Sequence, residues 1–401
     1  MGTKLEKVGL TEKNDLVIEN GTVYTPLKII QNGVTLIHNG KIAEVGSKSQ
    51  VKIPKGLMRI DAEEHIVCPG FLDLQVNGGG GVFLTENGTY DDVCMMARAH
   101  AKFGTTSMLP TILTSERDKI CTALKAVSEA VAKGTNGAAI LGSHLEGPFI
   151  NEKKKGAHEG KFIRSPSISD FDLFYQASKG TMKILTLAPE IEGSLSLIKH
   201  AKDRGVIVSI GHSIATYSQV CDAIEAGLSM ATHIFNAMEG LGSREPGTVG
   251  AILANDNLKT GLIADGIHVH PMSMKIVIRV KGKENVFLVT DAMPPVGTNL
   301  GSFELYGKTI YVKEGGCYTA DGTMAGSALS MNVAVKNIHQ YVGIPLNYAI
   351  AMATEVPAKA IGLSNMKGSL AVGRDADIVI CDSDMRIFKV LVGGRIVYEA
   401  Q

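Results

Sequence analysis

The sequence predicts an α/β protein in which a (β/α)8 TIM-like barrel carries a small β-sandwich built from both termini. Two observations predict the barrel: short apolar runs alternate with helical stretches across residues 68–367, and eight such runs can be counted. That alternation is typical of βα units in a parallel sheet, and eight strands close a barrel. A third observation predicts the sandwich, because both ends of the chain consist of short alternating segments without helical stretches.

The two end segments are expected to form one unit. Asn-Gly pairs at Asn20-Gly21 and Asn39-Gly40 predict hairpins, and Gly393-Gly394 separates two alternating runs near the C-terminus. Neither end has enough apolar residues for a core of its own. We therefore expect residues 1–67 and 368–401 to pair into one small domain, which brings the termini together.

The barrel strands are expected where the apolar runs occur in the remaining residues, 68–367. They are Gly70–Val76, Thr105–Pro110, Ala138–His144, Lys183–Ala188, Gly205–Ile210, Ser229–Thr232, Lys259–Ala264 and Val286–Thr290. A doubly wound open sheet is the competing arrangement, but no GxGxxG motif follows the first strand. After the eighth strand, a segment at about 292–325 has its own β-like pieces, and we expect this insertion to shape the active-site mouth.

The composition is that of an ordinary soluble protein. Lys+Arg and Asp+Glu both number 40, so the formal net charge is zero, which argues against nucleic-acid or membrane-surface binding. Six cysteines are scattered without a CxxC motif, as in a reducing compartment. The segment MGTKLEKVGLTEKND lacks the apolar region of a secretory signal, and no apolar run reaches transmembrane length. We therefore expect a cytoplasmic protein.

Histidines and carboxylates end several of the expected strands. Glu146 ends the third strand, whereas His212 and His233 follow the fifth and the sixth. Side chains at the C-terminal ends of barrel strands point into the active-site mouth, where ligands from different strands can converge. Taken singly, each of these residues is more readily structural. Together they supply the three N/O ligands of a catalytic zinc site, whose fourth position is left to water.

Other polar residues are candidates for the chemistry around this metal. Asp291 ends the eighth strand, as a helix N-cap or as a proton shuttle. Gln75 and Asn77 share one face of the first strand. They are amides, which bind such cations weakly, so we expect no second metal there; they either cap the mouth or bind water or substrate. His158, in the loop KKKGAHEG, is either solvated or polarises a carbonyl.

Two further segments are candidates for binding an anion. FNAMEGLGSREPG contains Asn236, Ala237 and Arg244, and DGIHVH contains His268. Arg and His side chains with exposed backbone N–H groups make a phosphate site, although an exposed Arg in a Gly-rich loop commonly has no such role.

These segments together resemble the N-acetylglucosamine-6-phosphate deacetylase family of the amidohydrolase superfamily. The resemblance extends from PGFLDLQVNGGGG to GSLAVGRDADIVI, nearly the whole chain. PGF.D and DADIV are shared widely in the superfamily, whereas HLEGPF, THIFNAM with REPG, and AGSALSM are more specific. The resemblance implies hydrolysis of the acetamide of N-acetyl-D-glucosamine 6-phosphate to D-glucosamine 6-phosphate and acetate, in amino-sugar catabolism and recycling.

The resemblance also implies roles for individual residues. Glu146, His212 and His233 would hold one divalent metal ion per chain, with Asp291 as the catalytic acid and base. Zn²⁺ is expected and Fe²⁺ is the alternative, since members with Gln and Asn on the first strand are of the single-metal type. The substrate-binding residues implied are His158 near the acetyl carbonyl, Asn236, Ala237, Arg244 and His268 at the phosphate, and Met324 over the sugar. In the family, the phosphate site is completed across the interface of a homodimer.

Two alternative functions stay open. Another amidohydrolase, acting on a different amide, would predict HxH on the first strand and often a carbamylated Lys after the fourth. The chain has Gln75 and Asn77 instead, and its fourth strand ends in APE. A catalytically inactive scaffold barrel would typically have lost metal ligands, whereas the four strand-end candidates are all present.

Overall fold

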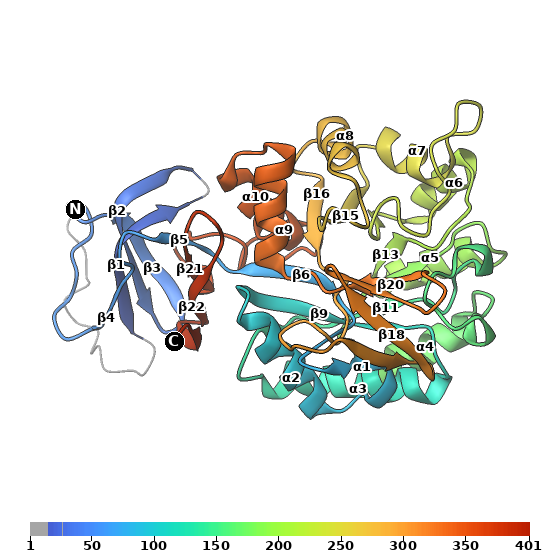
Figure 1. The fold of residues 1–401 in the computed structure, drawn as a ribbon, viewed down its shortest axis with the longest axis horizontal. Helices are drawn as coiled ribbons and strands as arrows, with labels where there is room; N and C mark the ends of the chain where they lie inside the picture. The colour runs from blue at the N-terminus through green and yellow to red at the C-terminus, as the bar shows by residue number, and fades with distance from the viewer. Residues whose placement is uncertain (1–14, 26) are drawn as a thin grey trace.

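Eight parallel strands form a barrel in the computed structural model, which describes residues 15–25 and 27–401 (Figure 1). In order around the barrel they are β6 (Phe71–Val76), β9 (Thr105–Leu113), β11 (Ser143–Glu146), β12 (Met182–Leu187), β13 (Ile207–Ile210), β14 (Met230–Ala231), β15 (Lys259–Ile263) and β16 (Val286–Val289). Each coincides with one expected strand. The third is broken, because β10 (Ala139–Ile140) pairs with β9 and the chain bends at Gly142, where φ is +140°, before β11.

The barrel closes where its last strand meets its first. Thr290 donates its backbone N–H (3.2 Å) and its hydroxyl (2.5 Å) to the carboxylate of Asp73 on β6. The backbone N–H of Asp291 donates to the carbonyl of Gln75 at 3.0 Å. Asp73 is fully buried, and this burial raises the pKa of its carboxyl to about 7, although the hydrogen bonds from Thr290 and Gln75 oppose the shift.

Helices surround the barrel and pack apolar residues against it. They are α2 (Tyr90–Ala101), α3 (Arg117–Lys133), α4 (Ile168–Ala177), α5 (Ser194–Asp203), α6 (Tyr217–Ala226), α7 (Gly247–Ala254), α8 (Pro271–Lys281), α9 (Met331–Asn337), α10 (Leu346–Met352) and α11 (Glu355–Ala360). Side-chain caps fix several starts: Thr89 and Thr216 form capping boxes, and Ser167 accepts from the N–H of Asp170.

Strands from both ends of the chain form a second sheet, at the left of Figure 1. Its strands are β1 (Leu16–Tyr24), β2 (Ile29–His38), β3 (Lys41–Ser47), β4 (Met58–Asp61), β5 (Ile66–Pro69), β21 (Ile378–Cys381), β22 (Ile387–Val392) and β23 (Arg395–Glu399). The order is β23-β22-β21-β5-β1-β2-β3, with β4 on β1. The pairing of the two ends is therefore confirmed, as one hydrogen-bonded sheet; the limits 1–67 and 368–401 stay a prediction.

Two of the three glycine-containing pairs form the turns of hairpins. Asn39-Gly40 joins β2 to β3 and Gly393-Gly394 joins β22 to β23, all four residues having positive φ. The hairpin predicted at Asn20-Gly21 is wrong, because both residues lie inside β1 at a bulge. Gly21 is needed there for close approach, since a Cβ would lie 2.6 Å from Val67 Cγ2.

The segment after β16 forms a small antiparallel sheet beside the barrel mouth. Its strands are β17 (Ser302–Leu305), β18 (Lys308–Lys313), β19 (Gly316–Tyr318) and β20 (Met324–Ser327). The sheet is joined to the barrel where the N–H of Met293 donates to the carbonyl of Ser327 at 2.9 Å. The hydroxyl of Tyr306 also donates to the carbonyl of Thr114, just after β9, at 2.7 Å.

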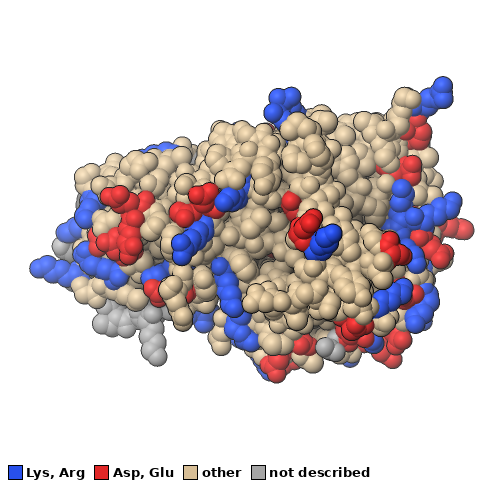
Figure 2. All heavy atoms as spheres, viewed as in Figure 1, with Lys and Arg blue, Asp and Glu red and all other residues tan. Residues whose placement is uncertain are grey.

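Charges of both signs are intermixed on the face shown in Figure 2, in keeping with the zero net charge. Within the described ranges, no helix has the length and apolarity needed to cross a membrane. Residues 1–14, on which the expectation about a secretory signal rests, lie outside the described residues.

We predict that Asp73 makes stability depend on pH. Its pKa is about 7 in the folded protein and 3.8 as the ordinary value, so the folded state binds more protons between these pH values. Stability from this group is therefore present below pH 4 and lost as pH rises to 7, by roughly 2–4 kcal/mol. Urea unfolding of wild type and Asp73→Asn should show wild type losing stability relative to the variant over this range. A constant difference between the two would contradict the assignment.

Candidate functional site

Four polar residues follow barrel strands at the same end of the barrel. Glu146 is the last residue of β11, whereas His212, His233 and Asp291 each lie two residues beyond β13, β14 and β16. The backbone of these last three residues has positive φ, at 51°, 28° and 51°. Non-glycine residues rarely adopt that conformation, which costs about 1–3 kcal/mol and persists only where surrounding contacts impose it. In each case the chain turns sharply and directs the side chain over the mouth.

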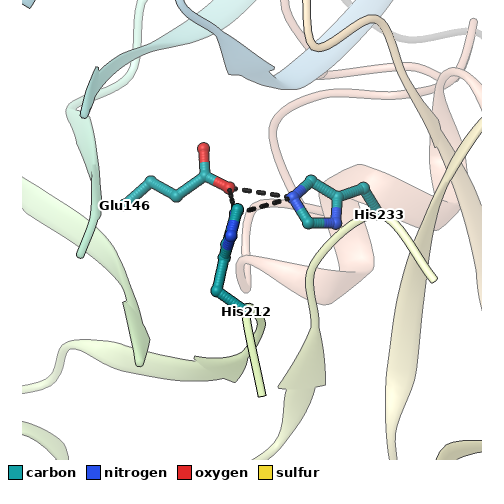
Figure 3. Close-up of side chains that lie close together, drawn as sticks. All are labelled: Glu146, His212 and His233. Carbon is teal, nitrogen blue, oxygen red and sulfur yellow. Dashed lines mark hydrogen bonds and ion pairs between the residues drawn. The ribbon is translucent and has the colours of Figure 1, made fainter. Parts of the chain in front are cut away.

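Glu146, His212 and His233 point toward one another (Figure 3). Glu146 Oε1 lies 3.0 Å from His212 Nε2 and 2.9 Å from His233 Nε2, and the two Nε2 atoms are 3.3 Å apart. All three side chains are buried. Burial alone would raise the pKa of Glu146, but its contacts with the two imidazoles hold the pKa well below the ordinary value. The same contact raises the pKa of His233 against the opposite effect of burial.

This donor set fits a divalent metal ion. His212 Nδ1 lies 2.8 Å from the carbonyl of Lys154, which only accepts, so Nδ1 carries a proton and Nε2 is the nitrogen that can offer a lone pair to an ion in place of its contact with Glu146. Among the described residues, this is the group of His, Cys, Asp and Glu whose donor atoms lie close enough to hold one ion. Two nitrogens and one oxygen from three strands leave a coordination position open, which is typical of catalytic rather than structural zinc sites.

Asp291 stands beside this triad on a support of amides. Its Oδ1 accepts hydrogen bonds from Gln75 Nε2 at 3.0 Å and from Asn77 Nδ2 at 2.6 Å. Gln75 Nε2 also donates to Glu146 Oε2 at 2.9 Å, so one amide group joins the two carboxylates. Burial, followed by the charge of Glu146, raises the pKa of Asp291 to about 6. A bound divalent cation would lower it again.

His158 lies on the other side of His212, with the two ring centroids 4.5 Å apart. Its Nδ1 lies 3.3 Å from the backbone N–H of Thr114 and 2.7 Å from the hydroxyl of the same residue. Because a backbone N–H can only donate, Nδ1 is an acceptor and the proton of the neutral ring is on Nε2. Burial, with a smaller effect of His212, lowers the pKa of His158 to about 3, so the ring is neutral at pH 7.

A cavity of about 150 Å³ brings most of the sequence-predicted residues together. Its lining includes Asn77, Glu146, His158, His212, His233, Asn236, Ala237, His268, Asp291 and Met324. Gln75 lies outside this lining and contacts it through its hydrogen bonds to Glu146 and Asp291. The cavity therefore has the metal triad, an acid–base candidate and a neutral N–H donor around one space.

Three further residues of the cavity lining, Asn236, Ala237 and His268, have features of an anion site. Ala237 has φ 49°, and the side chain of Asn236 is anchored on the carbonyl of His233 at 3.1 Å. His268 Nδ1 lies 2.5 Å from Asp265 Oδ2, so Nδ1 carries the proton and the Nε2 edge of the ring is left for a ligand. Arg244 is exposed in the loop of residues 240–245 and does not line the cavity of its own chain.

Sequence reasoning missed three groups that orient the predicted residues: Asp265, Thr114 and the carbonyl of Lys154. Asp265 stands three residues before His268 in DGIHV, a spacing that could have identified it as the partner of that ring. Thr114 directly follows β9, so the strand-end argument applied to the second strand would have included it. A backbone carbonyl such as that of Lys154 leaves no signal in the sequence.

Comparisons with known proteins agree with this geometry. The profile of the Amidohydrolase family matches residues 66–397. N-acetylglucosamine-6-phosphate deacetylase of Bacillus subtilis (strain 168) is 36% identical over 386 residues, 96% of this chain and 97% of that protein. N-acetylgalactosamine-6-phosphate deacetylase of Escherichia coli O157:H7 is 37% identical over 359 residues, 90% of this chain and 94% of that protein.

Solved structures give the same family likeness. The crystal structure of N-acetylglucosamine-6-phosphate deacetylase from Pasteurella multocida has a TM-score of 0.91 and 36% identity, covering 96% of this chain and 100% of that chain. A variant of the Mycobacterium smegmatis deacetylase, solved in complex with N-acetyl-D-glucosamine-6-phosphate, has a TM-score of 0.88 and 29% identity, covering 96% of this chain and 99% of that chain.

We predict that the triad is required for metal binding. Wild-type protein loaded with zinc and desalted should carry about one ion per chain. Zinc affinity should fall by more than ~100-fold in each of three variants: Glu146→Gln, His212→Asn and His233→Asn. Loss of a residue that only hydrogen-bonds to a ligand already lowers metal affinity by ~10–100-fold. His270→Asn is the control: His270 caps α8, and Asn caps helices equally well. Chelator competition measures the affinities; a triad variant that binds zinc as wild type does would refute the site.

Proposed function

Because this chain belongs to the amidohydrolase family and, within it, to the deacetylases of N-acetylated amino-sugar phosphates, we propose that it hydrolyses the acetamide of N-acetyl-D-glucosamine 6-phosphate. The products are D-glucosamine 6-phosphate and acetate. The observation that carries the proposal is the convergence of Glu146, His212 and His233 beside Asp291 in one cavity. Metal-assisted hydrolysis of an unreactive amide requires a metal site and an acid–base group that face the same cavity.

The metal proposed is Zn²⁺, with Fe²⁺ as the alternative. Two imidazoles and one carboxylate suit zinc, and imidazole suits iron as well. Bound there, the ion would act as a Lewis acid on the acetamide carbonyl and lower the pKa of the attacking water. The first strand contributes Gln75 and Asn77, whose N–H groups already satisfy Glu146 and Asp291, which supports one metal per chain.

His158 is proposed to orient the scissile amide. With Nδ1 held by Thr114, its Nε2–H is the donor available to the carbonyl oxygen of the substrate. A neutral donor in a buried site stabilises the negative charge that develops on this oxygen in the transition state. Because His158 is packed against His212, the carbonyl would lie next to the metal ligands.

Asp291 is proposed to move the proton. Both amides bind Oδ1, which leaves Oδ2 to take a proton from the attacking water. Burial beside Glu146 raises the pKa of the carboxyl in the metal-free protein; a bound cation would offset this shift and keep the carboxylate ionised, ready to accept a proton at neutral pH. The same oxygen then returns the proton to the departing nitrogen, so that glucosamine 6-phosphate leaves with a neutral amine rather than an amide anion.

The phosphate is proposed to bind at Asn236, Ala237 and His268, with Arg244 from a second copy of the chain. Arg244 lies in an exposed loop outside its own cavity, and Leu241 in the same loop is 65% exposed. On α8, Met272, Ile276 and Val280 are about half exposed at four-residue spacing, an apolar stripe on one helix face. Both features support a homodimer.

Met324, at the start of β20, is proposed to close over the sugar ring, since it lines the cavity from the inserted sheet. A cytoplasmic location is proposed from the free cysteines and from a phosphorylated substrate, which occurs inside cells.

We predict that acetate is released from N-acetylglucosamine 6-phosphate by wild type and not by Asp291→Asn, with a loss of at least ~10³-fold in kcat. N-acetylglucosamine without phosphate should lose kcat as well as affinity, because remote binding energy positions the amide. Enzymatic acetate detection measures both, with zinc content as the control for folding and loading. Absence of acetate from either sugar with loaded, folded wild type would refute the proposal.

The galacto epimer is the informative competitor, since relatives of this chain act by name on either sugar phosphate. We expect kcat/KM to favour the gluco substrate. If kcat/KM is higher for N-acetylgalactosamine 6-phosphate, the chain is still a deacetylase, but the galacto sugar phosphate is its preferred substrate.

We predict that the Arg244→Ala and Asp291→Asn subunits complement each other. In a mixed dimer, one of the two sites keeps both Asp291 and the partner's Arg244. Half of randomly reassembled dimers are mixed, so activity should recover to about a quarter of the wild-type value. The two variants, each nearly inactive, are unfolded, refolded together and assayed. No recovery, while wild-type protein treated the same way regains activity, would place Arg244 outside the neighbouring site.

A further inference from the structure

Glu190 joins two loops of the barrel mouth through one carboxylate. It follows β12, and its Oε1 accepts hydrogen bonds from the side-chain amide of Asn151 at 2.9 Å and the backbone N–H of Ile214 at 2.8 Å. Its Oε2 accepts from the hydroxyl of Ser213 at 2.7 Å. Asn151 lies in the segment after β11, just before the short helical turn Glu152–Lys154, whereas Ser213 and Ile214 directly follow His212. None of these four residues lines the substrate cavity.

The loop that starts at Asn151 holds His212 at two points. The backbone N–H of Asn151 donates to the carbonyl of His212 at 3.0 Å, and the carbonyl of Lys154 accepts from His212 Nδ1 at 2.8 Å. The same loop carries His158, whose ring packs edge-on against that of His212. The relative position of these two histidines therefore depends on how the two loops are joined, and Glu190 is bonded to both.

His212 needs such support because of its backbone. At φ 51° it is in the left-handed region, which a non-glycine residue keeps only where its surroundings impose it. The two residues after it supply two of the three donors to Glu190. Without the acceptor, the buried Ser213 hydroxyl and the Ile214 N–H would lose these hydrogen bonds, and less would oppose relaxation of the His212 backbone to negative φ. The ring would then swing Nε2 away from Glu146 and His233.

We propose that Glu190 is a positioning residue for the metal centre. It holds His212 in the geometry needed to bind the ion and fixes the position of His158 relative to His212. This inference deepens the proposed function and rests on it. Glu190 touches neither the donor atoms nor the cavity, so it acts through the two loops. If Glu190 instead acted by attracting the cation with its negative charge, the neutral and isosteric Glu190→Gln would lower metal affinity as much as Glu190→Ala.

The test compares Glu190→Ala, Glu190→Gln and the control Glu192→Ala, which is exposed two residues away. Zinc affinity is measured by competition with a chromophoric chelator, ligand geometry by the visible spectrum of Co²⁺-loaded protein, and folding by thermal unfolding of the metal-free protein. Glu190→Ala should lower zinc affinity by ~10–100-fold and change the visible spectrum of the Co²⁺-loaded protein. Glu190→Gln keeps Oε1 for both N–H donors and can donate to Ser213, so it should stay within ~3-fold of wild type.

Two outcomes would overturn the inference. If Glu190→Ala lowers the melting temperature of the metal-free protein but leaves zinc affinity and the Co²⁺ spectrum unchanged, Glu190 only stabilises the fold. If Glu190→Gln weakens zinc as much as Glu190→Ala, charge rather than position is responsible. Should Glu190→Ala not fold, Asn151→Ala, which loses one of the three donors, must weaken zinc measurably. A wild-type protein that binds no zinc would instead refute the proposed function, and this inference with it.

Discussion

The buried carboxylate of Glu146 is the group on which the arrangement of the site depends. An ionised carboxylate is costly to bury unless hydrogen bonds or opposite charge compensate it. Here the compensation comes from two imidazoles and one amide, carried by β13, β14 and β6, on both sides of β11 around the barrel. A change in the register of any of these strands would remove a partner and leave the charge exposed to an apolar interior. The strand register of the barrel and the positions of the partners of Glu146 therefore depend on each other.

Gln75 explains how two carboxylates coexist a short distance apart. Glu146 raises the pKa of Asp291, so the repulsion is real, and in a two-metal site a second cation would offset it. Here one NH₂ group divides its two hydrogens between the carboxylates, and Asn77 adds a third N–H. The amide N–H groups stabilise the two carboxylates by hydrogen bonds, and Asp291 keeps its negative charge. Asp291 therefore keeps Oδ2 free to exchange a proton.

The sequence was sufficient for the features that repeat or that stand at fixed places in the fold. The eight strands were predictable because apolar runs alternate with helices, and the convergence of Glu146, His212 and His233 because strand ends meet at one mouth. The turn predicted at Asn20-Gly21 failed because the local preference of Asn-Gly was overridden by the close approach of Val67. The hydrogen bonds that the Glu190 carboxylate and the Lys154 carbonyl make between loops were beyond prediction, since such bonds have no period and no fixed spacing. Arg244 is exposed and does not line the cavity of its own chain, so its predicted role at the phosphate depends on the proposed homodimer.

The sheet shared by the two ends has a consequence for synthesis of the chain on the ribosome. β5 ends at Pro69, and its partner β21 begins only at Ile378. At about 5–20 residues per second, the edge of β5 waits roughly 15–60 s for that partner. During this time its unpaired N–H and C=O groups are open to strands of other nascent chains. The entire barrel must be translated before the first-made sheet is complete, so nascent-chain chaperones that cover strand edges should matter more for this protein than for one whose termini fold apart.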